Sequence, residues 1–175
     1  MPNYDHTSDE RLVAAALEDD LGAWEAFLRR HGTRLLAFTT RMCGDEATAR
    51  ELWVQAFQEL WTQRAALARG GRAATSVFAL AVSQCAKSAE PAKQIRPKGD
   101  PASLEQRSAR LRQALLGIPF RARAALCLCY FDNVSFEEAE RCLGVAPGEA
   151  RRLCAEGYEA LTRSLGPGFL NEGLA

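Results

Sequence analysis

The chain has 175 residues, of which 47% are hydrophobic and 25% are charged, the composition of a globular protein with one ordinary domain or two small ones. Its 22 lysine and arginine residues equal its 22 aspartate and glutamate residues, so the chain lacks the excess positive charge with which a protein binds duplex DNA unaided. A polar, acidic start and the absence of a long apolar run predict a cytoplasmic protein without a membrane anchor.

Apolar residues recur at helical spacing through the first half of the chain, and no strand pattern stands out. Ser8, followed by two acidic residues, is typical of a helix start. A long amphipathic helix with apolar positions between Trp24 and Met42 should follow and end at Gly44. Asp45 opens the next helix, DEATARELWVQAFQELW. The stretch ATSVFALAVSQCAKSA is apolar nearly all round, which predicts a helix in the middle of a small bundle.

Residues 90–103, EPAKQIRPKGDPAS, contain three prolines and a glycine but almost nothing to bury. This composition predicts a linker. We therefore expect an all-α protein with two small helical domains, residues 8–89 and 104–166, joined by a proline-containing linker.

Four helices are expected beyond the linker. The first two cover LEQRSARLRQALLGI and FRARAALCLCYFDN, with Pro119 at the start of the second. Ser135 and Glu138 form a capping box for the third, which should end at Gly144. Pro147 is suited to the first turn of the fourth.

The last two predicted helices, within residues 135–165, have the outline of a helix-turn-helix, whose second helix enters the DNA major groove. A helix that binds DNA is usually basic, but this one is neutral. Its three arginines are balanced by three glutamates: Arg151, Arg152 and Arg163 against Glu149, Glu156 and Glu159. The motif thus favours DNA binding, and the charge opposes it.

Six cysteines are spread along the chain: Cys43, Cys85, Cys127, Cys129, Cys142 and Cys154. Without a secretion signal they do not predict disulfide bonds. Cys127 and Cys129 are two apart, which in a helix turns their side chains to nearly opposite sides and does not suit zinc. We expect free thiols that fill apolar positions, with a metal or redox site as the alternative, and no bound metal or cofactor.

Catalytic motifs are missing from the sequence. The two histidines are His6 in the polar N-terminal tail and His31 within an apolar helix face, and there is no glycine-rich phosphate loop or nucleophile elbow. We expect no enzymatic activity, and we interpret His31 as a partly buried helix residue rather than a base.

Over roughly residues 8 to 165 the chain resembles the extracytoplasmic-function (ECF) group of bacterial RNA polymerase sigma factors. The resemblance lies in DERLVAAALEDDLGAWEAFLRRHGTRLLAF, GDEATARELWVQAFQELW and LRQALLGIPFRARAALCLCYFDNVSFEEAERCLGV. It implies a promoter-melting domain (region 2), a linker, and a region 4 domain that ends in a helix-turn-helix. It also implies core RNA polymerase as partner, an anti-sigma factor as a possible second partner, and no chemistry of its own.

The resemblance implies that the polymerase binds the face around RELWVQAFQELW. The candidate contacts are Glu51, Leu52, Trp53, Gln55 and Gln58. We expect Leu52, Trp53, Val54 and Ala56 to form an exposed apolar patch for a protein partner. The alternative for Trp53 is a core position.

The candidate contacts to the minus-10 DNA strand are Phe78, Ser83 and Lys87. Family members usually carry a tryptophan and several arginines in this helix, where the present chain has small or apolar residues such as Ser76 and Ala79. Single-stranded DNA binding requires a positive groove with stacking side chains. Phe78 is the one candidate for stacking, and its apolar neighbours favour a core position instead.

The candidate contacts to the minus-35 element are Glu149, Arg151 and Arg152. Glu149 stands near the start of the helix, where family members have threonine or serine, and its charge would repel a phosphate. Arg151 and Arg152 are the best candidates, with exposed solubilising charges as the alternative interpretation.

The crossing of the last two helices departs from the family pattern as well. A small residue on the first helix and a valine or isoleucine on the second are replaced by Glu140 and Ala150. An unpaired buried carboxylate is costly. We therefore expect either that the first helix rotates Glu140 outwards or that the two helices open, giving a non-standard crossing.

Two functions are compatible with these observations. The first is an ECF-type sigma factor that directs core RNA polymerase to promoters and binds promoter DNA only within the holoenzyme. The alternative is a degenerate sigma-like interaction module that binds an anti-sigma factor or the polymerase without recognising a promoter. The neutral last helix favours the alternative, whereas the order of the eight helices suits both.

Overall fold

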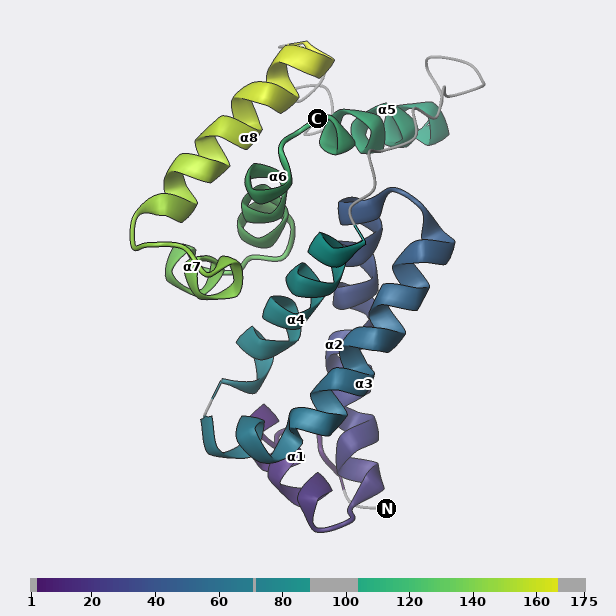
Figure 1. The fold of residues 1–175 in the computed structure, drawn as a ribbon. Helices are drawn as coiled ribbons and strands as arrows, with labels where there is room; N and C mark the ends of the chain where they lie inside the picture. Colours follow the sequence, from purple (N-terminus) through teal and green to yellow (C-terminus); the bar gives the residue numbers. More distant parts are fainter. Residues whose placement is uncertain (1–2, 71, 89–103, 167–175) are drawn as a thin grey trace.

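The computed structural model of the chain describes residues 3–70, 72–88 and 104–166, and the predicted linker at 90–103 lies outside them. The described residues form eight α-helices and one π-helical segment, η1, without a β-strand, which confirms the all-α prediction. In chain order (Figure 1) these are α1 (Asp9–Leu17), α2 (Leu21–Cys43), α3 (Glu46–Gly70), α4 (Ala73–Lys87), α5 (Leu104–Leu116), α6 (Phe120–Leu126), η1 (Cys127–Phe131), α7 (Phe136–Leu143) and α8 (Glu149–Leu165). We call α1 to α4 the N-terminal lobe and α5 to α8 the C-terminal lobe.

Local hydrogen bonds set the ends of the first helices, and Ser8 and Gly44 have the roles that the sequence predicts. The Ser8 hydroxyl accepts a hydrogen bond from the Arg11 amide at the start of α1. The Asp20 carboxylate accepts a hydrogen bond from the Ala23 amide at the start of α2. Gly44 ends α2 with a φ of 78°, a left-handed conformation that glycine adopts without strain.

The capping signals of the C-terminal lobe are confirmed with one exception. Ser135 and Glu138 form the predicted capping box of α7, and Gly144 ends that helix in a left-handed conformation. The prediction for Pro147 was wrong: α8 begins only at Glu149, so Pro147 lies in the turn before the helix and not in its first turn.

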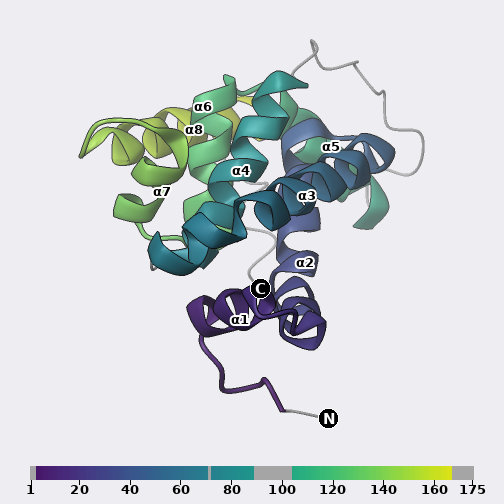
Figure 2. The same ribbon diagram turned by 60° about the horizontal axis from the view of Figure 1, so that its bottom comes forward.

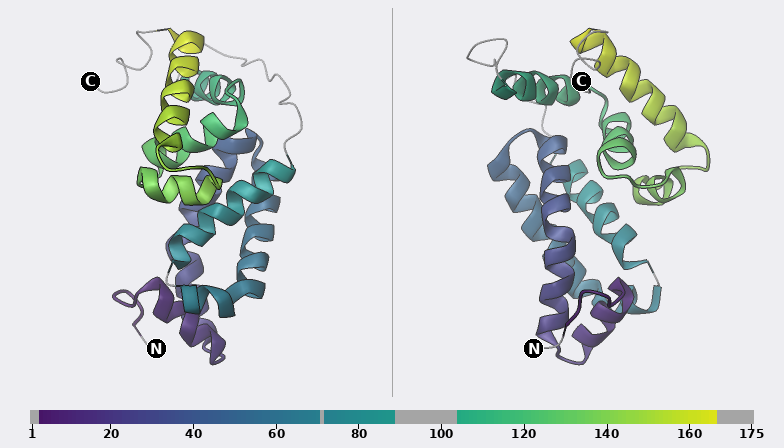
Figure 3. Two further views of the ribbon diagram at one scale, coloured as in Figure 1. Left: turned by 60° about the vertical axis from the view of Figure 1, so that its left-hand side comes forward. Right: turned by 180° about the vertical axis from the view of Figure 1, so that it is seen from behind.

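Helix α4 is central to the N-terminal lobe, as its apolar sequence predicts. It contacts α1, α2 and α3 and, on another side, α7 of the C-terminal lobe (Figure 3). Val77 and Ala81 of α4 are fully buried. The largest side chains in the surrounding core are Phe27, Phe38, Leu35 and Leu60. Burying each of these contributes about 1.5–3 kcal/mol relative to exposure.

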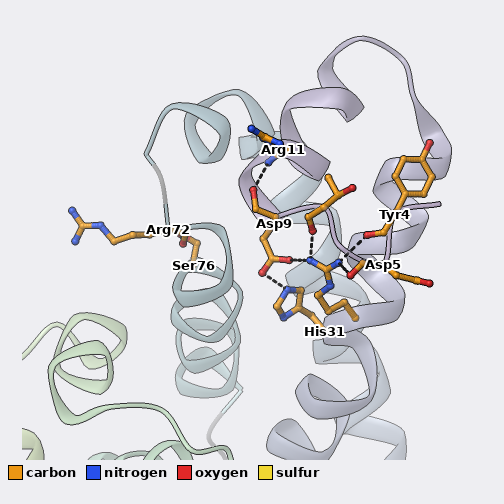
Figure 4. A network of polar contacts seen from close by, with 10 residues as sticks. Tyr4, Asp5, Asp9, Arg11, His31, Arg72 and Ser76 are labelled. Carbon is orange, nitrogen blue, oxygen red and sulfur yellow. Dashed lines mark hydrogen bonds and ion pairs between the residues drawn. The ribbon is translucent and has the colours of Figure 1, made fainter. Parts of the chain in front are cut away.

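A polar network ties the N-terminal segment to α2 (Figure 4). Asp9 accepts a hydrogen bond from Arg30 at 2.6 Å and lies 2.8 Å from Nε2 of His31, which is 5% exposed. Arg30 also donates to the backbone carbonyl of Thr7. Burial opposes ionisation of Asp9, but the hydrogen bonds and charges of His31 and Arg30 outweigh it and hold the pKa of this carboxyl below its usual value. His31 is therefore buried and paired with Asp9, in agreement with its prediction as a helix residue.

The C-terminal lobe is built on a close approach of α6 and α8. A Cβ at Gly157 would lie 2.9 Å from the backbone oxygen of Ala122, so only glycine fits there without movement of the backbone. The sequence predicts one helix through residue 133. Instead the α-helix ends at Leu126 and continues as η1, and Asn133 leaves it with a φ of 50°.

All six cysteines are free, and four of them, Cys85, Cys127, Cys142 and Cys154, are buried as the simpler interpretation predicts. Burial raises the pKa of the Cys85, Cys127 and Cys142 thiols to about 12, so they are unreactive core groups. Cys129 differs because a hydrogen bond from the neighbouring Cys154 thiol lowers its pKa. In the part of the chain that the structure describes, no group of three or more His, Cys, Asp or Glu side chains is placed to hold a metal ion.

The two lobes contact each other. Helix α7 packs on α4, and α2 contacts α5, α6 and η1. Figure 2 shows α7 beside α4, with α3 on the other side of α4. Among the described residues, no helix is both long and apolar enough to cross a membrane.

Candidate protein-docking and nucleic-acid interfaces

The predicted polymerase-binding residues divide into exposed and buried members on α3. Glu51, Gln55 and Gln58 are exposed and, at intervals of four and three residues, lie on one face of the helix. Leu52 is only 4% exposed and packs in the core. Its side chain is therefore unavailable to a partner.

The predicted apolar patch was partly wrong for the same reason. Leu52 and Ala56 point into the core, whereas Val54 is 42% exposed. Trp53 is half-buried: its Nε1 donates to the backbone oxygen of Gly32 at 2.8 Å, and its ring meets Phe57 edge-on. The patch is thus reduced to Val54 and one part of Trp53.

A groove beside this face supplies apolar surface that the sequence did not reveal. It has a volume of about 510 Å³ and lies between α2 and α3. Its lining includes Trp24, Trp53, Val54, Phe57, Gln58 and Trp61. Trp24 and Trp61, on different helices, meet edge-on at 5.2 Å between ring centres. The spacing of Trp24 and Trp61 within their own helices predicted apolar faces, but only the packing of α2 against α3 brings the two rings together.

Of the minus-10 candidates on α4, Phe78 is part of the core. It is 5% exposed, meets Phe38 edge-on at 5.6 Å between ring centres, and is covered by the Arg34 guanidinium at 5.5 Å. A base has no access to its ring, so the core interpretation was right and the stacking role was wrong. Ser83 and Lys87 are exposed on the C-terminal half of α4.

The minus-35 candidates are close together on the first turns of α8, but the cations are not equivalent. Arg152 forms a short ion pair with Glu149 and a second one with Glu156 at 3.4 Å. The hydrogen bond from Arg152 lowers the pKa of Glu149, which keeps this carboxylate charged beside the guanidinium. Arg151 is exposed and lies 4.5 Å from the centre of the Phe136 ring. Arg152 is therefore neutralised within the helix, and Arg151 is the better phosphate contact.

The turn between α7 and α8 adopts neither arrangement that the sequence predicts. Glu140 stays buried, at 9% exposure, and the helix does not rotate it outwards. Its carboxylate accepts hydrogen bonds from the backbone amides of Gly148 at 2.6 Å and Ala150 at 3.4 Å. The N-cap of α8 is Gly148, which has no side chain to cap the helix. Glu140 therefore takes that role from the neighbouring helix and places a negative charge at the positive end of α8.

The described residues thus define an all-helical, two-lobed protein whose last two helices have the outline of a helix-turn-helix. No family model matches the chain. Its relatives include the ECF RNA polymerase sigma factor SigM of Mycobacterium tuberculosis strain H37Rv, with 28% identity over 181 aligned residues that cover 95% of this chain and 88% of that protein. SigM of strain Erdman matches to the same extent. These relatives confirm the resemblance to ECF sigma factors that the sequence predicts.

Proposed function

We propose that this chain is an ECF-type sigma factor that binds core RNA polymerase in the cytoplasm and directs it to promoters. In this proposal residues 8–89 act as region 2, residues 104–166 act as region 4, and 90–103 connect them. The chain itself catalyses no reaction and needs no cofactor. Similarity to ECF sigma factors along 95% of the chain is the observation that carries the proposal.

The α2–α3 face supports the polymerase-binding part of the proposal. It combines an aromatic groove with a row of exposed polar residues, Glu51, Gln55 and Gln58. Protein interfaces have this composition, with an apolar centre rich in tryptophan and a polar rim. Trp53 and Val54 would contact the partner from the edge of the groove, while Leu52 acts only by supporting them from the core.

The proposed DNA contacts are exposed residues of α4 and α8. Ser83 and Lys87 would lie along the minus-10 strand, and Arg151 would contact a phosphate of the minus-35 element. Arg152 contributes only if the DNA displaces its two carboxylate partners, Glu149 and Glu156. Because the chain has no net charge, the polymerase must supply most of the attraction for DNA.

The pairing of Arg152 and the burial of Phe78 favour a second candidate function. In this alternative the sigma fold binds an anti-sigma factor or the polymerase but recognises no promoter. Both functions use the α2–α3 face. They differ in whether a promoter-specific transcript is made.

The test mixes the purified chain with core polymerase and measures co-elution and transcription from promoters of the same genome. Val54→Arg should weaken co-elution at least tenfold, whereas Gln63→Arg, on the opposite side of the same helix, should not. Arg151→Ala should reduce the transcript, and Arg163→Ala, three turns further along α8, is its control. Co-elution without any promoter-specific transcript would support the alternative function. Failure to co-elute would refute the sigma-factor function and would leave only the anti-sigma-binding form of the alternative.

A further inference from the structure

A buried ion pair joins the two lobes. Asp132, directly after η1, is only 4% exposed. Its Oδ2 accepts a hydrogen bond from Arg41 at 2.6 Å, and its backbone oxygen accepts one from Arg34 at 2.5 Å. Both arginines belong to α2 and are two turns apart on one face of that helix. The Arg41 guanidinium also lies 5.1 Å from the centre of the Phe131 ring. The end of η1 is thus held by two cations of the other lobe.

Helix α7 makes a second contact between the lobes, on α4. The two helices pack together (Figure 3), and the Cys142 thiol of α7 donates to the backbone oxygen of Thr75 in α4 at 3.5 Å. Cys142 itself is 6% exposed. In this arrangement the first helix of the helix-turn-helix covers part of the helix that carries the minus-10 candidates.

Two properties of the ion pair favour its separation: the cost of burying Asp132 and its access to solvent. Burial raises the pKa of Asp132 by more than the charges of Arg41 and Arg34 lower it, so burying this carboxylate costs free energy that the pair only partly offsets. Beside it an open cavity of about 450 Å³, lined by Arg34, Arg41, Phe131 and Asp132 among others, gives solvent a route to the contact. When the lobes separate, all three charged groups regain water. The hydration regained on opening therefore offsets part of the interaction energy that is lost with the ion pair.

In the closed arrangement the chain is too compact to reach a minus-10 and a minus-35 element at the same time. A compact chain of this length has a radius of gyration of about 16 Å. A minus-10 and a minus-35 element are about 25 base pairs apart, or about 85 Å at 3.4 Å per base pair. Since α7 touches α4 while α8 follows directly after α7, the two DNA-contacting helices cannot reach both elements at once.

We propose that Arg34, Arg41 and Asp132 form a latch that keeps the free protein in a closed resting state, and that release of Asp132 lets the C-terminal lobe move away to meet the minus-35 element. The role of the latch in reaching the minus-35 element rests on the proposed function. The latch itself is a property of the isolated chain and can be tested without polymerase.

The structural test uses small-angle X-ray scattering on the isolated full chain. Asp132→Arg sets a third cation against Arg34 and Arg41 and should increase the radius of gyration about 1.3-fold. The double exchange Asp132→Arg with Arg41→Asp restores an opposite-charge pair and should return it towards the wild-type value. Glu137→Arg, the same change of charge at an exposed position of α7, should have no effect. Circular dichroism establishes that each variant is folded, and Arg34→Ala with Arg41→Ala replaces Asp132→Arg if that variant unfolds. An unchanged radius in folded opening variants would overturn the latch.

The functional test adds core polymerase and a promoter. At limiting protein concentration the opened variant should form promoter-specific transcript at least threefold faster than the wild type, and the charge exchange should restore the slower rate. If the variant opens but transcribes at the wild-type rate, the closed state has no regulatory role and that part of the proposal is wrong. If it opens and neither protein gives any transcript, the latch is supported and the proposed promoter function is refuted.

Discussion

Replacing Glu140 by alanine should destabilise the C-terminal lobe more than any other charged-to-alanine change in α7. The carboxylate accepts two backbone hydrogen bonds at the start of α8. Gly148 is exposed, so water can replace the first bond, but Ala150 is fully buried and its amide would be left without an acceptor. A charge-assisted hydrogen bond and an orphaned buried amide together correspond to a loss of about 3 kcal/mol. Glu140→Gln keeps an acceptor and loses only the charge, for which we expect a cost of about 1 kcal/mol.

The assay must report on the C-terminal lobe. All three tryptophans, Trp24, Trp53 and Trp61, lie in α2 and α3, so their fluorescence follows the other lobe. Urea unfolding should be followed by circular dichroism at 222 nm, and amide hydrogen exchange should be measured at Ala150. For Glu140→Ala the loss of about 3 kcal/mol corresponds to about 100-fold less protection of that amide.

Glu137→Ala is the matched control, because Glu137 is an exposed glutamate on the same helix. Its effect should stay within about 0.5 kcal/mol. If Glu140→Ala were as stable as Glu137→Ala, with the Ala150 amide still protected, the capping role of Glu140 would be wrong.

Three further outcomes are expected. Asp9→Asn should cost about 2 kcal/mol at neutral pH, since it removes charged hydrogen bonds to His31 and its neighbour. Folding lowers the pKa of Asp9, so this stabilisation is complete above the ordinary carboxyl pKa of about 3.9. It is lost as the pH falls through the lowered pKa. The acid unfolding curves of variant and wild type should therefore converge at low pH. Gly157→Ala should cost about 1–3 kcal/mol by overpacking, measured by urea unfolding, whereas Gly70→Ala, with nothing within 4 Å of the added carbon, should be neutral or stabilising. Iodoacetamide at about pH 8 should label Cys129 first, as shown by mass spectrometry, and equal labelling of all six thiols would contradict its lowered pKa.

Features that depend on a few neighbouring residues were predictable from the sequence. Ser8, Gly44 and the Ser135–Glu138 box mark helix ends because their hydrogen bonds or backbone angles involve residues within one helical turn. The order of the helices followed from these signals and from apolar spacing, whereas the resemblance to ECF sigma factors lay in particular sequence stretches. The same spacing places Leu52, Ala56 and Leu60 on one face of α3, and in the structure this face is buried.

The candidate sites depended on contacts between distant parts of the chain. Asp132 is 91 residues from its partner Arg41, and no local pattern pairs them. The sequence by itself determined an all-α chain with a neutral last helix and a resemblance to ECF sigma factors. Only the tertiary structure decided that Phe78 is core and that Glu140 caps α8 instead of opening the turn. The carboxylates that pair with Arg152, by contrast, lie three and four residues away on its own helix. The physical reason is that a buried charge or ring takes its partner from whichever helix packs against it, and that choice is made by the three-dimensional arrangement of the helices.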